Sequence, residues 1–325
     1  MSVSHSPPVM SAHTNIYLMA SASAALLGIM TSCIYDDIRP CDDKVEFTIV
    51  TDWKYAPDAR PEGMAYMFFR RGVASPWRFD FPSGEAGKVA LEAGEYDFVT
   101  FNDDTSDIIF KDGSHGMPFV TTAMRRETVG DEDMDLYEPP DMMWSAFMAP
   151  VVVDPSGIGY EGAPGDDGCR NPYSLVVTPR RITPLYTVRI LHVGNLQGVA
   201  AMKGIISGMS PGIDLYRMER QGEGVEVSFS PQIAADSTVA ARFCTFGVSE
   251  THGNAHRLRL YFRLSDNSLQ SRDYDVSSTV ASAPDPMNVE IVIDSISLPY
   301  SPPAESGAFD PSVAGWSTVV VNYGT

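Results

Sequence analysis

Short runs of alternating apolar and polar residues restrict the fold of this sequence more than any other feature. Such a run places every second side chain on one face of a β-strand, and the runs recur at a spacing of roughly ten residues. No amphipathic helical stretch separates them. The clearest runs are Val45–Val50, Trp77–Phe81, Tyr96–Phe101, Leu185–Leu191, Val225–Phe229, Ala241–Phe246, Arg257–Phe262 and Val289–Asp294, and the wholly apolar Met64–Phe69 is expected to form a further strand. They predict an all-β protein of sandwich type.

Two series of these runs suggest two tandem sandwiches. We predict an N-terminal β-sandwich at 42–153 and a C-terminal β-sandwich at 173–299. Residues 154–172 are rich in Gly and Pro and are expected to form a linker or loop. Residues 300–325 are expected to form a connector and a terminal strand. Within the first series, residues 125–140 are polar and acidic and show no expected strand.

The charge balance excludes several classes of function. The chain has 23 Lys+Arg against 42 Asp+Glu, a formal net charge of −19. Nucleic-acid binding and docking on anionic lipid both need clustered cations, so neither is expected. Apolar residues make up 44% and charged residues 20%, as in a globular protein. No apolar run reaches the roughly 20 residues of a membrane span.

The N-terminus has the pattern of an export signal. Residues Ile16–Met30 are apolar and have the length of a signal-peptide core. Small residues precede Cys33, as in a bacterial lipobox, which predicts a signal peptide at 1–32, a lipid on Cys33 and a tether at 33–41. No Lys or Arg precedes Arg39, unlike a usual signal, and a start at Met10 would add none. The alternative is an ordinary buried helix with a core Cys.

Asp36 and Asp37 follow the predicted lipid site. Acidic residues at this place resemble the surface-export signal of lipoproteins in Bacteroidetes-type bacteria. The alternative is a solvated acidic tether that no receptor reads.

Four cysteines leave the disulfide pattern open. With a lipid on Cys33, three remain in an oxidising compartment, and one disulfide would leave one free thiol. Spacing does not decide which pair forms. Cys41 and Cys169 lie in polar contexts, which favours them as the pair, whereas Cys244 alternates with apolar neighbours and is expected to be a buried small hydrophobe.

Two local motifs resemble enzyme sites but lack necessary parts. Gly208–Gly212 matches G-x-S-x-G, yet Pro211 follows Ser210 and has no N–H to offer an oxyanion. We therefore expect a turn between strands. His252 and His256 have the spacing of helical metal ligands, but a strand follows at once and we expect surface-loop histidines.

Acidic clusters and tryptophans suggest no specific ligand. The carboxylates of Asp103, Asp104 and Asp107, or of Asp131, Asp133 and Asp135, have the chemistry of Ca²⁺ ligands, but the second set lacks the glycine and the final acid of a calcium loop. No local motif supports the carboxylate pair of a glycosidase. We therefore expect the acidic clusters to lie in solvated loops and most tryptophans to lie in the sandwich cores. We expect no metal and no cofactor.

The order of several weak motifs resembles a known family. A lipobox Cys and acidic stretch precede the Val45–Val50 strand. Pro61–Met64 and Val89–Asn102 follow, and Gly204–Met209 and Ile293–Pro299 mark the second half. The sequence thus resembles the fimbrillin-associated anchor lipoproteins of Bacteroidetes-type fimbriae and their fimbrillin-like relatives of unknown function. The resemblance covers about 42–300.

The resemblance implies two transthyretin-like or Ig-like sandwiches without enzymatic activity. It implies a surface-exposed protein, anchored to the outer membrane by lipid, that acts as a fimbrial anchor or minor subunit and engages a pilin or other surface protein by strand addition. Two segments are candidates for that exchange. They are the first strand, with Val45, Phe47 and Ile49, and the terminal strand Trp316–Val321, with Val319, Val320 and Val321. The alternative is that each completes its own domain.

A second function also fits the sequence. A surface glycan-binding lipoprotein of a nutrient-uptake system would carry the same export signal and the same β-sandwich fold. Aromatic side chains along one sheet face would favour it.

Overall fold

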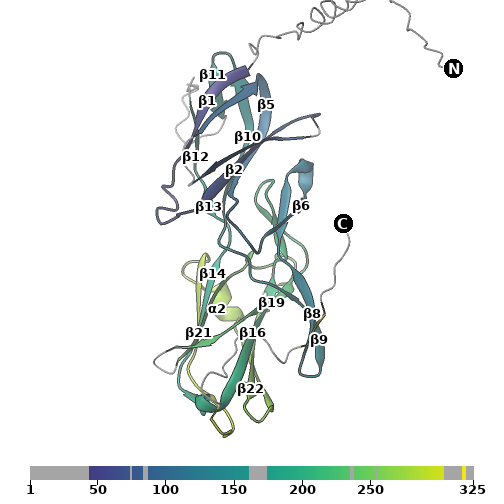
Figure 1. Ribbon diagram of the computed structural model, residues 1–325, viewed down its shortest axis with the longest axis vertical. Coiled ribbons are helices and arrows are strands. Elements are labelled where there is room, and N and C mark those ends of the chain that lie inside the picture. Colours follow the sequence, from purple (N-terminus) through teal and green to yellow (C-terminus); the bar gives the residue numbers. More distant parts are fainter. Residues whose placement is uncertain are drawn as a thin grey trace, which may run out of the picture. The chain divides into compact units, whose positions relative to one another are not determined.

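The computed structural model describes residues 44–73, 75–82, 87–160, 174–234, 238–253, 255–303 and 317–319 (Figure 1). Within these ranges the protein is almost entirely β-structure, with one short helix, α2 (Ser277–Ala281), and the 3-10 turns η1 (Ser114–Gly116) and η2 (Leu196–Gly198). The prediction of an all-β sandwich fold is confirmed. The predicted signal peptide, tether, Cys33, Asp36, Asp37, Cys41 and Cys169 lie outside the described residues.

Two facing sheets form the first sandwich. One has the order β12-β1-β4, and the other has the order β11-β10-β5-β2-β3, with β13 paired to β10. Their strands are β1 (Lys44–Thr51), β2 (Gly63–Arg70), β3 (Trp77–Pro82), β4 (Gly87–Glu92), β5 (Gly94–Asn102), β10 (Trp144–Asp154), β11 (Gly157–Tyr160), β12 (Ser174–Val177) and β13 (Arg180–Arg181). Alternating residues point inward, and the ring of Phe68 has the rings of Phe47, Tyr96 and Phe98 4.7–6.1 Å away.

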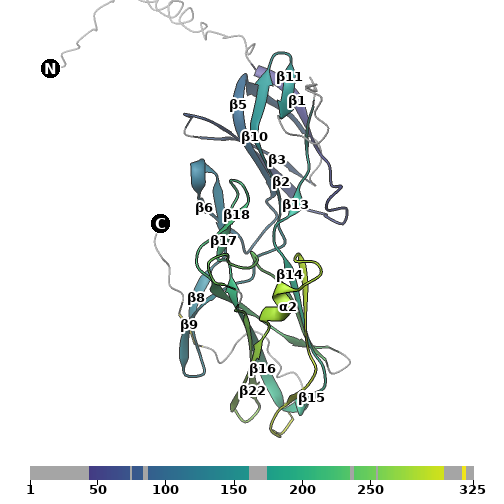
Figure 2. The same cartoon turned by 180° about the vertical axis from the view of Figure 1, so that it is seen from behind.

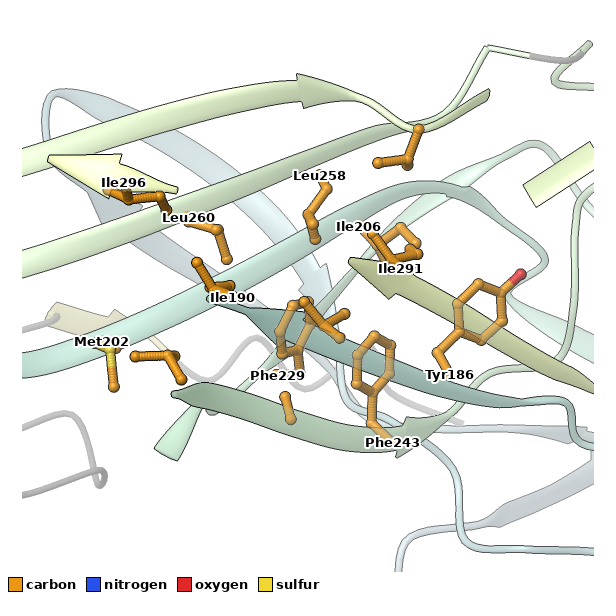
Figure 3. Close-up of a cluster of buried hydrophobic side chains, with 14 of the residues drawn as sticks. Tyr186, Ile190, Met202, Ile206, Phe229, Phe243, Leu258, Leu260, Ile291 and Ile296 are labelled. Atoms are coloured by element: carbon orange, nitrogen blue, oxygen red, sulfur yellow. The ribbon is translucent and has the colours of Figure 1, made fainter. Parts of the chain in front are cut away.

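The second sandwich pairs a four-stranded sheet, β20-β21-β14-β24, with a seven-stranded sheet, β23-β22-β16-β19-β9-β8-β26. Their strands are β8 (Met124–Val129), β9 (Glu132–Tyr137), β14 (Leu185–Ile190), β16 (Val199–Met209), β19 (Val225–Phe229), β20 (Gln232–Ile233), β21 (Val239–Cys244), β22 (Arg257–Leu264), β23 (Leu269–Asp275), β24 (Asn288–Ile293) and β26 (Ser317–Val319). Figure 3 shows their shared core, in which Phe229 and Phe243 stack with ring centroids 4.1 Å apart.

Two smaller sheets complete the described structure. One is the short pair β15 (Val193–Gly194) and β25 (Ile296–Ser297), and the other has the order β18-β17-β7-β6 (Figure 2). The strands of the latter are β6 (Ile109–Asp112), β7 (Pro118–Thr121), β17 (Gly212–Asp214) and β18 (Glu219–Gln221). Val120 and Ile213 of this sheet join Val99 and Phe101 of β5 in a third apolar cluster. Gly212 permits the close pairing of β17 with β7, because a Cβ there would lie 2.2 Å from the Val120 carbonyl oxygen.

Strand pairing departs from the linear boundaries expected from the sequence. Strands β8 and β9 arise from residues 125–140, where no strand was expected, and β9 pairs in parallel with β19 of the second sandwich. In the opposite sense, β12 follows residue 173 yet pairs in parallel with β1 of the first sandwich. Each sandwich therefore takes strands from both halves of the chain. The division of the chain into domains at 42–153 and 173–299 remains a prediction.

Part of the expected linker is also a strand. Residues 157–160 form β11, which pairs with the end of β10 as a hairpin. The turn is closed because the backbone N–H and the hydroxyl of Ser156 both donate to Asp154 Oδ1, and Gly157 adopts a φ of 142°. The expectation of a loop is wrong for these four residues, since a short Asx turn brings the chain back onto β10.

Candidate functional site

Enzyme-like motifs form ordinary structural contacts. Ser210 lies in the turn between β16 and β17, with its hydroxyl 2.7 Å from the Gly212 carbonyl oxygen and 3.1 Å from that of Gln221. It is 1% exposed, so it does not face a site open to substrate. The prediction of a turn between strands is confirmed.

The two histidines are close together, but one expectation about them is wrong. Their ring centroids lie 6.3 Å apart, and His256 is only 2% exposed instead of lying on a surface loop. Its Nδ1 lies 3.2 Å from the Ser207 carbonyl oxygen. Room for the ring comes from Gly208, which has a φ of 81° and whose Cβ would lie 2.5 Å from that Nδ1. Among the residues described, no cluster of His, Cys, Asp and Glu has the geometry of a metal site.

Carboxylates join the acidic loop near Asp103 to neighbouring segments of the chain. Asp104 accepts from the Glu62 N–H at 2.7 Å, and Asp141 Oδ2 accepts from the N–H groups of Ser106 and Asp107 at 2.7 and 2.8 Å. Burial raises the pKa of the Asp107 carboxyl, and the nearby Asp141 and Glu138 raise it further. These hydrogen bonds indicate a structural role for the carboxylates, which fix the loop against Glu62 and Asp141.

The other acidic cluster and Cys244 also have structural positions. Asp131, Asp133 and Asp135 are exposed on the β8–β9 hairpin. Cys244 is free and 7% exposed, as expected of a buried small hydrophobe, and burial raises the pKa of its thiol.

The first candidate exchange strand is built into its sandwich. Strand β1 lies between β12 and β4 in the three-stranded sheet. Phe47 and Ile49 are 3% and 0% exposed in the core, and Val45 packs against the same core. Both edges of β1 are therefore paired, and exposing either would disrupt the sandwich core.

The second candidate strand lies at a sheet edge. Strand β26 pairs antiparallel with β8, with Ser317 opposite Thr128 and Val319 opposite Arg126. Val320 and Val321 lie outside the described residues. Because β26 is the last strand in the order of the seven-stranded sheet, only its pairing with β8 joins it to that sheet. An edge strand held on one side is the arrangement that strand addition requires.

Beneath this edge lies a second apolar face of the same sheet. On β8, Val129 points to the face opposite the main core, where it joins Met134, Leu136, Ile205 and Tyr261 in a small buried cluster. We call the β8 edge together with this cluster the β8 edge site. In the sequence, this site is indicated by the alternation of Met134 and Leu136 with acidic residues, within a stretch that is polar and acidic as a whole.

The β8 edge site also contains a buried ion pair. Lys203 Nζ of β16 contacts Glu127 Oε2 of β8. Lys203 is 4% exposed and Glu127 is 7% exposed. Around it the exposed positions of β8 form surface pairs, including Arg126 with Asp135 at 3.9 Å. A cavity of about 800 Å³ borders the strand, and Arg125, Glu127 and Lys203 line it together with acidic residues. The site thus offers backbone donors and acceptors along one edge, with mixed charge beside them.

No helix among the described residues is both long enough and apolar enough to cross a bilayer.

Comparisons with solved structures show which known folds the chain shares. A candidate adhesin from Bacteroides ovatus superposes with a TM-score of 0.59 at 20% identity, covering 83% of this chain and 98% of that chain. A second candidate adhesin from the same species gives a TM-score of 0.50 at 14% identity, with coverage of 82% and 92%. These similarities show a common fold.

The fimbrial anchor protein Mfa2 from Porphyromonas gingivalis also matches, with a TM-score of 0.45 at 12% identity, covering 76% of this chain and 90% of that chain. No curated protein matches the sequence. A family model does match, from residue 32 to residue 230, and it extends over both sandwiches. The chain therefore belongs to the DUF5119 family, a domain of unknown function.

Proposed function

We propose that this protein is a non-catalytic surface protein, anchored by lipid to the outer membrane, that engages a fimbrial subunit by strand addition at the β8 edge site. The observation that supports it most is the pairing of β26 with β8, because β26 is the last strand in the order of its sheet and covers the edge of β8. A strand at a sheet edge is held by a hydrogen-bond ladder on one side, so an incoming strand of a partner can replace it.

Other observations agree with a surface role. The lipobox-like residues before Cys33 and the acidic pair Asp36 and Asp37 provide the anchor and the export signal in this proposal. The solved structures of similar fold include candidate adhesins. The described residues bring together no catalytic constellation or metal cluster, and the enzyme-like motifs form buried structural contacts.

A reversible lock on β26 tests the proposal. Ser317 and Thr128 are direct register partners, so Ser317→Cys with Thr128→Cys places two thiols opposite each other on adjacent strands. The tagged full-length protein is purified from its native envelope, oxidised or reduced, and the proteins that co-purify are measured by mass spectrometry. We expect the oxidised variant to lose a fimbrial subunit that the reduced variant retains.

The matched control is a lock at another sheet edge. Met67→Cys with Arg78→Cys joins β2 to its edge strand β3 at a register pair remote in sequence from β8. This control, and each single-cysteine variant, should retain the partner. Equal recovery of the subunit from the oxidised and reduced Ser317/Thr128 variants would refute strand addition at β8.

A further inference from the structure

The charged side chains that line a second cavity are positive, whereas the protein as a whole is negative. Its volume is about 410 Å³, and residues of β10, of the connection from β12 to β14 and of β17–β18 line it, together with Met287. This size falls within the roughly 300–1,000 Å³ of small-molecule sites. Its charged lining residues are all arginines: Arg180, Arg181, Arg217 and Arg220.

These four arginines have neutral partners. Arg181 Nη2 donates to Asn288 Oδ1 at 2.8 Å and also to the Met287 carbonyl oxygen. Arg220 Nε donates to the Phe246 carbonyl oxygen at 2.9 Å. The guanidinium carbons of Arg180 and Arg217 lie over the rings of Tyr55 and Tyr216, 4.1 and 5.1 Å from the centroids. Neutral partners fix these side chains in position without neutralising them.

No carboxylate of the described residues forms an ion pair with these four arginines. The nearby Asp285 carboxyl accepts from the Asn288 side chain and the Met287 N–H, and these bonds, with a smaller contribution from the charge of Arg181, lower its pKa. The ion pairs found in the described ranges use other arginines, such as Arg78, Arg125, Arg189 and Arg259. The nearby carboxylate of Asp214 instead accepts from neutral donors, the N–H groups of Ser114 and Tyr216 and the amide of Gln221. In a chain with 42 acidic and 23 basic residues, four arginines around one cavity, none of them in an ion pair with a described carboxylate, constitute a concentrated positive site.

The remaining lining adds an apolar wall. Phe147, Ile182, Ile213 and Met218 face the same cavity. Phe147 packs edge-on against Tyr216, with centroids 5.1 Å apart, so the ring on which Arg217 lies also borders the apolar wall. A ligand for this site therefore needs an anionic group for the guanidinium forks and an apolar face beside it. A uronic acid has both, because its carboxylate projects from a pyranose ring whose C–H groups form apolar faces.

We propose that this cavity binds an acidic saccharide, with its carboxylate held by Arg217 and Arg220 and its ring against Phe147 and Met218. The site involves no strand exchange, and its residues are distinct from those of the β8 edge site, so either proposal can fail without the other.

Calorimetry on the full-length protein in detergent tests this proposal. The probes are tri-galacturonate, neutral tri-galactose and inorganic phosphate. We expect tri-galacturonate to bind, its affinity to fall with added salt, and tri-galactose to bind at least about tenfold more weakly, since the charge supplies the recognition. Arg217→Gln and Arg220→Gln should each weaken tri-galacturonate about tenfold or more, with Arg220→Lys intermediate, because lysine keeps the charge but loses the fork.

Arg272→Gln is the matched control. Arg272 also donates to backbone carbonyl oxygens, those of Ser271 and Ser297, but does not line the cavity. This variant should bind tri-galacturonate as the wild type does, and unfolding midpoints check that every variant remains folded. Absence of tri-galacturonate binding, equal binding of tri-galactose, or equal losses in Arg272→Gln would overturn the proposal. Phosphate binding as tightly as the saccharide would reduce the site to a general anion site and also overturn it.

Discussion

Glu127 and Lys203 bury opposite charges within one sheet, which makes each depend on the other. Residue exposures of 7% and 4% remove most of the water that would otherwise solvate them. Removing one partner of such a pair takes away the opposite charge that balances the other, whereas replacing both by apolar groups is often neutral or stabilising.

We therefore expect Glu127→Gln and Lys203→Met each to lower the free energy of unfolding by about 3–5 kcal/mol. The double variant Glu127→Leu/Lys203→Met should recover most of that loss. Urea unfolding of the three variants measures both effects. Additive losses in the double variant would mean that the two charges are not coupled.

Glu226 gives the stability a pH dependence of known sign. Burial raises the pKa of its carboxyl above the usual 4.5, although Arg259, 3.3 Å away, opposes the shift. The native state thus holds the Glu226 proton more tightly than the unfolded state does. The stability gained from this proton is complete below pH 4.5 and is lost as the pH rises through the raised pKa.

Glu226→Gln should remove that component. We expect the wild type to lose stability relative to Glu226→Gln as the pH rises from about 4.5 to 7. Unfolding of both proteins by urea at several pH values measures the difference, and Glu250→Gln, on an exposed turn, serves as the control. A difference that changes in the opposite direction would show that the ion pair with Arg259 outweighs burial.

At the scale of elements, regular alternation made most strands predictable, and interruptions by acidic residues concealed others. The alternating runs that contain Phe47, Phe98 and Phe229, and the apolar run that contains Phe68, form strands at the expected places. Strand β9 also alternates, but its outward positions are acidic, so that only Met134 and Leu136 indicate a strand. The pairing of strands could not be predicted, because the alternation of residues along a strand does not show which neighbouring strand it pairs with.

Strand β9 should contribute strongly to the second sandwich. Leu136 is 1% exposed in the small apolar cluster of the β8 edge site, and β9 lies between β8 and β19 in the sheet. We expect Leu136→Ala to lower the free energy of unfolding by about 2–5 kcal/mol, as for other buried leucines. Asp135→Ala, an exposed neighbour on the same strand, should change it by about 0.5 kcal/mol or less. Equal effects in urea unfolding would place Leu136 outside any cooperative core.

At the scale of the whole molecule, the class of fold followed from composition and period, whereas the arrangement of the chain did not. Short strands separated by Gly- and Pro-rich turns limit a chain to sandwiches or barrels. Strands β8 and β9 precede most of the second sandwich in the sequence yet belong to its seven-stranded sheet, and β12 follows residue 173 yet belongs to the first sandwich. These pairings join residues far apart in the sequence. The arginine-lined cavity was equally hidden, because its four cations come from two separate segments.

The proposed lipid anchor makes a prediction about the entire protein. Cys33→Ser should move it from the membrane fraction to the soluble fraction, because the acyl chains provide the attachment. Fractionation followed by immunoblotting measures the distribution, and Cys41→Ser, which keeps the lipid site, should remain in the membrane fraction. Retention of Cys33→Ser in the membrane would argue for another means of attachment.

The pairing of β1 with β12 has a consequence for the proposed export of the chain. Thr48 emerges early from any secretion channel, but its register partner Ser174 emerges only after most of the first sandwich has passed. Contacts between such distant residues form slowly, since a long loop must close first. The first strand to emerge would thus wait for its neighbour. In the proposed lipid-anchored protein this keeps the leading part of the chain unfolded, and therefore able to pass through a channel, during export and acylation.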